Sequence, residues 1–131
     1  MNVQPSAAPP RVLVADDDEH IRFLLDLTLR QAGLDPLVAA DGHEAVELFG
    51  RHKDEVRAVL LDVNMPGLDG PGALAQIRQI DPQVPCCFMT GYSGRYAVED
   101  LMALGATCVM EKPFRIDEVL ETLRDLCGRT R

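Results

Sequence analysis

The sequence predicts an α/β domain built on a parallel sheet that helices cover on both faces. Five short apolar segments alternate along the chain with five segments of helical periodicity, an alternation typical of parallel sheets. The apolar segments are nearly continuous, as strands buried on both sides require. At 131 residues the chain has the length of one domain and can bury a core without disulfides or structural metals.

The first predicted strand covers residues 12–15 and leads into a helix. Asp18 and Glu19 stand at the start of this helix, where negative charge stabilises the helix dipole, and Gly33 marks its end. Helical spacing gives its core face as Ile21, Leu24, Leu25, Thr28 and Leu29.

A turn at Asp35 and Pro36 precedes the second predicted strand, residues 37–39. Asp41 and Gly42 then open a second helix. The apolar residues of its core face are Ala45, Val46, Leu48 and Phe49.

The third predicted strand covers residues 58–61 and ends at Asp62. Residues 64–70 contain too many turn formers to continue a strand or helix, so they predict a loop. The helix that follows has a core face of Leu74, Ile77 and Ile80. Asp81 and Pro82 end it.

The fourth predicted strand begins near Val84, and a helix is predicted over about residues 95–104, ended by Gly105. Its apolar residues are Ala97, Val98, Leu101 and Met102. The fifth strand covers residues 107–110, and the last helix begins at about Ile116. The core face of that helix is Ile116, Val119, Leu120 and Leu123.

The two ends of the chain predict no helix or strand. Residues 1–10 are rich in proline and alanine and predict a disordered leader, and residues 128–131 form a short tail. No second domain or internal repeat is predicted, and the chain stops directly after the last helix, so no output domain is expected.

Composition narrows the class of partner and the compartment. The 21 acidic and 13 basic residues give a net charge of −8, which disfavours direct binding to nucleic acid or to an anionic membrane. No apolar run is long enough to span a membrane, and the N-terminus is no secretory signal. The cysteines lack metal or redox spacing and are expected to be free thiols at Cys86, Cys87, Cys108 and Cys127. A cytoplasmic protein with protein partners is predicted.

Polar residues follow four of the predicted strands at the point where each strand ends. Asp16 and Asp17 follow the first strand, Asp62 the third, Thr90 the fourth and Lys112 the fifth. The carboxyl ends of parallel strands meet at one edge of a sheet, so these side chains are expected to share a pocket. Three carboxylates that close together need a cation, and an all-oxygen site with few protein ligands suits Mg²⁺. The pattern predicts magnesium and phosphate chemistry.

Each of these signals is weak alone, but their ordered combination is specific. The motifs are Val12-Leu13-Val14-Ala15-Asp16-Asp17, Asp62-Val63-Asn64-Met65-Pro66 with Asp69-Gly70, Thr90-Gly91 and Lys112-Pro113-Phe114. With them the chain resembles, over residues 11–127, the receiver domain of bacterial two-component response regulators. The resemblance implies a flavodoxin-like (βα)5 fold, a doubly wound parallel sheet of five strands in the order 2-1-3-4-5.

The resemblance also implies a role for each acidic residue. Asp62 is expected to accept a phosphoryl group from a phosphohistidine of a histidine kinase or a histidine phosphotransfer protein. Asp17, Asp62 and the backbone carbonyl of Asn64 are expected to bind Mg²⁺, and Asp16 to act through a coordinated water. The chain would catalyse only its own phosphorylation and dephosphorylation.

Further residues are expected to bind the phosphoryl group and to transmit the signal. By the resemblance, Lys112 pairs with one phosphoryl oxygen, and the Thr90 hydroxyl with the Gly91 N–H binds another. The bond between Lys112 and Pro113 is expected to be cis. Phosphorylation is expected to draw Thr90 inward and to change the surface that binds a downstream protein target. Many family members carry an aromatic residue where this chain has Val109, so the signal must travel by another route.

Two side chains are expected to set how long the phosphoryl group lasts. Asn64 and Tyr92 lie two residues after Asp62 and Thr90, where they would flank the path of an attacking water. Asn64 can orient that water, and the ring of Tyr92 can screen the phosphoryl group or merely cover the surface. The cognate kinase, the target, the pathway and a phosphorylation-dependent homodimer stay open.

Three hypotheses compete with that of a phosphorylatable receiver domain. The chain could be the receiver portion of a longer regulator or hybrid kinase. It could be a small Mg²⁺-dependent phosphatase, but such enzymes need a general acid two residues after the nucleophile, where this chain has Asn64. A receiver-like module that binds partners without phosphorylation is disfavoured, because no residue of the strand-end set is missing.

Overall fold

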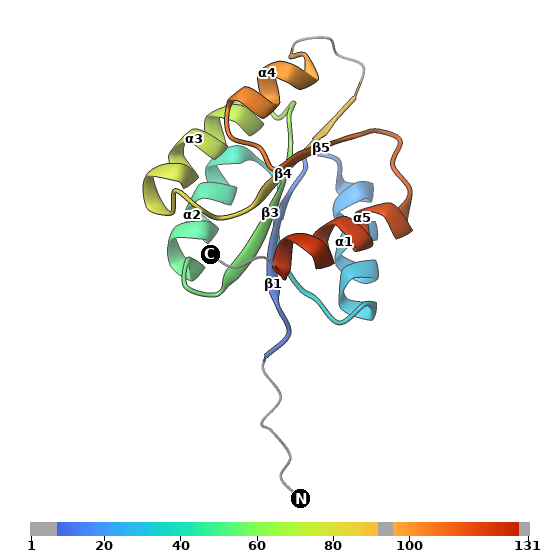
Figure 1. Ribbon diagram of the computed structural model, residues 1–131. Coiled ribbons are helices and arrows are strands. Elements are labelled where there is room, and N and C mark those ends of the chain that lie inside the picture. The colour runs from blue at the N-terminus through green and yellow to red at the C-terminus, as the bar shows by residue number, and fades with distance from the viewer. Residues whose placement is uncertain (1–7, 92–95, 129–131) are drawn as a thin grey trace, which may run out of the picture.

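Residues 8–91 and 96–128 are described by a computed structural model of the chain (Figure 1). The strands are β1 (Arg11–Ala15), β2 (Asp35–Ala39), β3 (Val56–Asp62), β4 (Cys86–Thr90) and β5 (Cys108–Glu111). The helices are α1 (Glu19–Gln31), α2 (Gly42–His52), α3 (Gly70–Ile80), α4 (Val98–Ala103) and α5 (Ile116–Cys127). The strands pair in parallel in the order β2-β1-β3-β4-β5, so the predicted fold is confirmed.

Helices cover both faces of the sheet, with α1 and α5 on one side and α2, α3 and α4 on the other (Figure 1). Successive side chains of a strand point to opposite faces, so each strand supplies both layers of the core. In β1, Leu13 and Ala15 pack in the layer under α2 and α3, whereas Val12 and Val14 pack in the layer under α1 and α5. This double burial explains the continuous apolar strands.

Acidic residues in the loops determine where three helices begin. Asp18, Asp41 and Asp69 are the N-cap residues of α1, α2 and α3. Each carboxylate accepts a 2.8 Å hydrogen bond from a backbone N–H of the first helical turn. Such caps satisfy donors that have no partner within the helix, so the loops that follow β1, β2 and β3 each end at a fixed point.

The predicted turn at Asp35 and Pro36 is wrong, because both residues belong to β2. They pair in parallel register with Arg11 and Val12 of β1. Proline cannot donate a ladder hydrogen bond, but β2 lies at the edge of the sheet and is paired on one side only, where proline is tolerated. Arg11 also forms a 3.0 Å ion pair with Asp35, which holds the start of the strand. The fourth strand likewise begins at Cys86, after the predicted Val84.

Helix α4 is shorter than predicted, and most of its apolar residues are not in the core. It covers Val98–Ala103. The Asp100 carboxylate accepts a 3.2 Å hydrogen bond from the N–H of Ala97, and this contact caps the start of the helix. Leu101 is fully buried, whereas Val98 and Met102 are 42% and 43% exposed. A helix of this length presents one side chain to the sheet and leaves its other apolar residues in solvent.

Two predicted core residues of other helices are partly in solvent. Leu24 of α1 and Ile80 of α3 are 40% and 37% exposed. Both lie at the edge of an otherwise correct apolar face, since Leu25, Leu29, Leu74 and Ile77 are buried.

The cysteines are free thiols, as predicted. Cys86, Cys87 and Cys127 are buried and Cys108 is half-buried. Burial raises the pKa of the Cys86 thiol to about 12, which keeps it protonated and unreactive. Among the described residues, no helix is long and apolar enough to cross a membrane. Residues 1–7 of the expected leader, residues 129–131 of the tail, Tyr92 and Arg95 lie outside the described residues.

Candidate functional site

The strand-end residues meet because of the register of the sheet. In the pairing of β1 with β3, Ala15 lies opposite Leu61, so the residues that follow them, Asp16 and Asp62, are neighbours. In the pairing of β4 with β5, Thr90 lies opposite Glu111, and Lys112 follows directly. The predicted convergence on one edge of the sheet is present in the structure.

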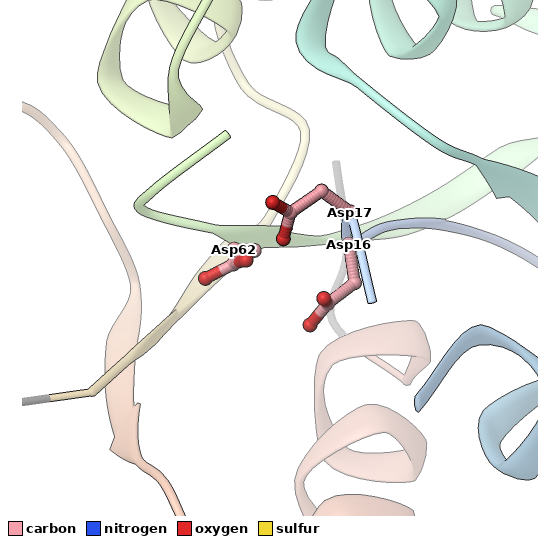
Figure 2. Close-up of side chains that lie close together, drawn as sticks. All are labelled: Asp16, Asp17 and Asp62. Atoms are coloured by element: carbon pink, nitrogen blue, oxygen red, sulfur yellow. The ribbon is translucent and has the colours of Figure 1, made fainter. Parts of the chain in front are cut away.

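Three carboxylates form a tight cluster at this edge, which we call the acid pocket. Asp16 and Asp17 come from the end of β1 and Asp62 from the end of β3 (Figure 2). One oxygen of each carboxylate lies within 4.8 Å of the others. Asp16 is fully buried and Asp62 is 4% exposed, whereas Asp17 lies at the open side. Two of the three charges are therefore held away from water.

The Lys112 side chain is the cation of the acid pocket. Its ammonium lies 2.8 Å from Oδ2 of Asp16 and 3.4 Å from Oδ1 of Asp62. The Lys112–Pro113 peptide bond is cis, and the Lys112 N–H donates a 2.8 Å hydrogen bond to the carbonyl of Thr90. One positive charge thus faces three carboxylates, so the pocket retains a net negative charge.

The crowding of charge changes the proton affinities in the acid pocket. Burial and the neighbouring charge of Asp16 raise the pKa of Asp62 to about 7, and Lys112 only partly opposes this rise. Burial by itself would lower the pKa of Lys112, but the hydrogen bond to Asp16 and the charge of Asp62 outweigh it and raise the pKa. The metal-free pocket therefore needs a further positive charge to keep all its carboxylates ionised near neutral pH.

Both oxygens of Asp16 are occupied by protein donors. The Asp18 N–H donates a 2.8 Å hydrogen bond to Oδ1, and Lys112 holds Oδ2. The backbone carbonyl of Asp16 also accepts a 3.0 Å hydrogen bond from the guanidinium of Arg22 on α1. Sequence reasoning missed this contact of Arg22, because nothing in the helical pattern indicates that a side chain six residues away turns back to the strand end.

The backbone hydrogen bond and the closest ammonium contact of Asp62 both fall on one oxygen. Oδ1 lies 3.4 Å from the Asn64 N–H and 3.4 Å from the ammonium of Lys112. Among the described residues, no hydrogen bond falls on Oδ2. The second oxygen is therefore the one that can meet an incoming electrophile.

Close backbone packing fixes the loop that carries Asn64. A Cβ at Gly70 would collide with the carbonyl oxygen of Asp62, and one at Gly42 would collide with the carbonyl of Leu68. These two glycines allow the loop from β3 to α3 to lie against the end of β3 and the start of α2. The sequence motif Asp69-Gly70 predicts a turn here, but it does not indicate the close contact that requires glycine.

A tyrosine connects the two loops that flank the acid pocket. The Tyr96 hydroxyl donates a 3.1 Å hydrogen bond to Oδ2 of Asp69, the residue that caps α3. Tyr96 is half-buried and packs against the core layer under α3 and α4. No local sequence pattern indicates this contact, because its partners are 27 residues apart.

Thr90 lies at the pocket end of β4 and is 7% exposed. Its hydroxyl donates a 3.2 Å hydrogen bond to the carbonyl of Gly91. The hydroxyl is thus engaged with its own backbone in this structure. Gly91 itself is exposed, and Tyr92 lies outside the described residues.

The donor set of the acid pocket fits a small divalent cation. Asp16, Asp17 and Asp62 offer carboxylate oxygens, which are hard ligands, and neither cysteine nor histidine belongs to the cluster. Mg²⁺ prefers such oxygens and keeps several of its waters, so it needs few protein ligands. The net negative charge of the acid pocket favours a bound cation of this kind.

Comparison with known proteins gives the family. The sequence model of the response regulator receiver domain matches residues 12–124. The chain belongs to this receiver domain family. The match covers the five strands except Arg11, the first residue of β1, and includes every residue of the acid pocket. The family consists of two-component signalling domains and not of conventional enzymes.

Curated relatives include proteins of different architecture. The transcriptional regulatory protein PrrA of Mycobacterium tuberculosis is 36% identical over 123 residues, which are 92% of this chain and 51% of PrrA. This chain therefore spans about half the length of the PrrA proteins that it matches. The sporulation initiation phosphotransferase F of Bacillus subtilis is 31% identical over 114 residues, which are 87% of this chain and 90% of that protein.

Solved structures agree with this assignment. The Vibrio cholerae chemotaxis protein CheY4 superposes with a TM-score of 0.82 at 30% identity, covering 91% of this chain and 99% of that one. A response regulator receiver domain from Clostridium thermocellum has a TM-score of 0.85 at 24% identity over 91% of this chain and 94% of that one, and shows the fold alone.

Proposed function

We propose that this receiver domain, residues 11–127, is a phosphorylatable switch whose acceptor is Asp62. The phosphoryl group would come from a phosphohistidine of a histidine kinase or of a histidine phosphotransfer protein. The observation that carries the proposal is the position of Asp62, buried at the end of β3 between two further carboxylates and the ammonium of Lys112.

The geometry supports a direct transfer to Asp62. Oδ2 attacks the phosphorus, a P–O bond forms, and the P–N bond to the donor imidazole breaks with its electron pair returning to nitrogen. The imidazole then takes up a proton from solvent. Such transfers depend mainly on placement and charge compensation, and the acid pocket supplies both.

Magnesium completes the charge compensation in this proposal. Asp17, Asp62 and the backbone carbonyl of Asn64 would hold the ion, which supplies positive charge to the phosphoryl oxygens. Asp16 would contribute through a coordinated water. This indirect role is supported by its contacts, since Lys112 and the Asp18 N–H already occupy both of its oxygens.

Lys112, Thr90 and Gly91 would bind the phosphoryl oxygens. The ammonium of Lys112 already lies 3.4 Å from Asp62, so a short movement brings it to a phosphoryl oxygen. The Thr90 hydroxyl would leave the carbonyl of Gly91 and turn inward, and the Gly91 N–H would donate beside it. Because the Thr90 carbonyl accepts from the Lys112 N–H, movement of Thr90 also reaches β5. The surface of α4, β5 and α5 would then change and signal to a downstream protein.

A second candidate function is that of a relay intermediate, which hands its phosphoryl group to another histidine. The match to the sporulation phosphotransferase over 90% of that protein's length favours this possibility. The two candidates share the acceptor and differ only in the next step. Incubation of the phosphorylated chain with histidine phosphotransfer proteins distinguishes them, because a relay intermediate loses its label to such a protein and a terminal switch does not.

Substitution of the acceptor tests the proposal. Asp62→Asn keeps the shape of the side chain and removes the anionic nucleophile, so we expect no phosphorylation by acetyl phosphate in the presence of Mg²⁺, measured as mass gain of the intact protein. Asp54→Asn is the matched control, since Asp54 is an exposed carboxylate in the turn before β3. It should label like the wild type. Undiminished labelling of Asp62→Asn would overturn the assignment.

A further inference from the structure

The hydroxyl of Tyr96 connects the segment after β4 with the segment after β3. Strand β4 ends at Thr90 and β3 ends at Asp62, so each segment begins at a residue of the proposed switch. The two segments lead to α4 and α3, which cover the same face of the sheet (Figure 1). The 3.1 Å hydrogen bond from Tyr96 to Oδ2 of Asp69 therefore bridges the two segments at the level of the acid pocket.

Asp69 is the fixed partner in this contact. Its Oδ1 accepts a 2.8 Å hydrogen bond from a backbone N–H in the first turn of α3, and its Oδ2 faces Tyr96. The next residue, Gly70, donates a 3.0 Å backbone hydrogen bond to the carbonyl of Val63, and a Cβ on Gly70 would collide with the carbonyl oxygen of Asp62. Asp69 is thus held against the backbone that carries the proposed acceptor.

On the β4 side, Gly91 has room to turn. The Thr90 hydroxyl donates a 3.2 Å hydrogen bond to the Gly91 carbonyl, and we call this the outward arrangement of Thr90. In the proposed function the hydroxyl and the Gly91 N–H both turn to a phosphoryl group, which requires the backbone at Gly91 to rotate. A Cβ at Gly91 would meet no atom within 4 Å, so close packing at this residue does not oppose the rotation. The restraint on it comes from contacts elsewhere along the chain.

Hydrogen bonds restrain the chain before and after Gly91. Before it, the carbonyl of Thr90 accepts a 2.8 Å hydrogen bond from the N–H of Lys112. After it, Tyr96 is bound to Asp69, and its half-buried ring packs against the core layer under α3 and α4. A hydrogen bond to a carboxylate is stronger than one between neutral groups. If it is made in only one of two arrangements, it shifts their populations.

We propose that Tyr96 is a positioning residue, whose hydrogen bond to Asp69 stabilises the outward arrangement of Thr90 and is weakened when Thr90 turns inward. Tyr96 would not touch the phosphoryl group. It would set how much of the free energy of phosphoryl binding is used to turn Thr90. The contact would also carry the movement of Thr90 to α3 by a route that does not use Val109. This inference rests on the proposed function, because it concerns the same switch and identifies what opposes it.

The affinity for beryllofluoride in the presence of Mg²⁺ tests the proposal, because beryllofluoride is a stable mimic of the phosphoryl group. Tyr96→Phe keeps the ring and its packing and removes only the hydroxyl. We expect it to bind beryllofluoride about threefold to tenfold more tightly than the wild type, since the inward turn no longer weakens a hydrogen bond. A hydrogen bond kept in both arrangements would affect the free energy of unfolding and leave this affinity unchanged. Isothermal titration calorimetry measures the affinity.

Asp69→Ser removes the same hydrogen bond from the other side. Serine still caps a helix through its hydroxyl, but its single short oxygen cannot also reach Tyr96. We expect a similar gain in affinity for beryllofluoride, and little further gain when Tyr96→Phe is added, because both changes remove one contact.

Asp41→Ser is the matched control, since Asp41 caps α2 with a 2.8 Å hydrogen bond in the same way. It removes the same charge at the same edge of the sheet and should bind beryllofluoride almost as the wild type does. Equal or weaker binding by Tyr96→Phe would overturn the proposal. A gain in Asp69→Ser that Asp41→Ser matches would be an effect of charge and would also overturn it.

The amide signal of Gly91 separates this proposal from the proposed switch. In NMR spectra of the ¹⁵N-labelled protein without beryllofluoride, we expect Tyr96→Phe and Asp69→Ser to displace this signal in the same direction and Asp41→Ser to leave it in place. If the wild type does not bind beryllofluoride but the first two variants displace the signal, the proposed switch fails and the role of Tyr96 stands. If the wild type and Tyr96→Phe bind equally and the signal does not move, the role of Tyr96 fails and the switch stands.

Discussion

The acid pocket and the solvent side of helix α5 both carry carboxylates, yet these carboxylates have different physical consequences. In the acid pocket, Asp16 and Asp62 are buried within a few ångström of each other, so their charges interact through a medium of low effective dielectric. On α5, Glu118 and Glu121 are exposed, and water and salt screen them. Burial thus turns one acidic cluster into a site that demands a cation, whereas exposure leaves the other as a solvated surface.

The largest expected effect concerns the metal. Asp17→Asn should raise the Kd for Mg²⁺ by about tenfold or more, because a direct ligand and one negative charge are lost. The same substitution should stabilise the metal-free protein by relieving repulsion. For the wild type, Mg²⁺ at about 100 times its Kd should add about 2.7 kcal/mol to the free energy of unfolding.

Thermal unfolding with and without Mg²⁺ measures this difference. The α5 variant Glu118→Lys, Glu121→Lys serves as control and should respond to Mg²⁺ as the wild type does. An unfolding midpoint of the wild type that stays constant up to millimolar Mg²⁺ would contradict the position of the metal site.

The next effect is a dependence on pH in the metal-free protein. The pKa of Asp62 is about 7 in the folded protein and near its ordinary 3.8 when unfolded, so the folded state binds the proton more tightly between these values. Its contribution to stability is fully present below about pH 4 and is lost as the pH rises through about 7. The Asp62→Asn variant has no titratable group at this position, so its stability does not change with pH for this reason.

Urea unfolding in the presence of a metal chelator measures the stability of the wild type and of Asp62→Asn. The stability advantage of Asp62→Asn over the wild type should grow between about pH 5 and pH 8. The same comparison for Glu118→Gln, at an exposed acid of α5, should give a difference that hardly changes with pH. A constant difference for Asp62→Asn would mean that the pocket does not perturb this carboxylate.

A smaller effect concerns the lifetime of the phosphoryl group. We propose that Asn64 orients the attacking water and that Tyr92 screens the phosphoryl group, so Asn64→Ala should lengthen its half-life severalfold and Tyr92→Ala should shorten it. Hydrolysis is followed with saturating Mg²⁺ and no kinase. Equal rates for the wild type and Tyr92→Ala would leave that tyrosine as a surface residue only.

The smallest effect is expected at Val109, which lies on strand β5. Val109 is half-buried, so Val109→Ala should cost about 1 kcal/mol of stability and leave phosphorylation of Asp62 intact. Urea unfolding and acetyl phosphate labelling measure the two. Loss of the response of a downstream protein to phosphorylation, with labelling and stability preserved, would instead show that Val109 transmits the signal from the acid pocket to the surface.

The sequence by itself determined the fold and the members of the acid pocket. Continuous apolar strands alternating with helices require a parallel sheet with two covered faces, and all strands of such a sheet end at one edge. Asp16, Asp62 and Lys112 therefore had to converge wherever the exact strand limits fell. The helix starts at Asp18 and Asp41 were equally predictable, because a cap is a local interaction within a few residues.

Only the tertiary structure decided the contacts within the pocket and which apolar residues of α4 are buried. The ammonium of Lys112 contacts Asp16, although the two residues are 96 positions apart in the sequence. Burial and the neighbouring charges together set the pKa of Asp62. Both depend on distances that a sequence pattern does not contain. Periodicity gives Val98 and Met102 as apolar residues of the fourth helix, but burial depends on what lies opposite a helix. Because α4 presents only Leu101 to the sheet, its other apolar residues became part of a surface.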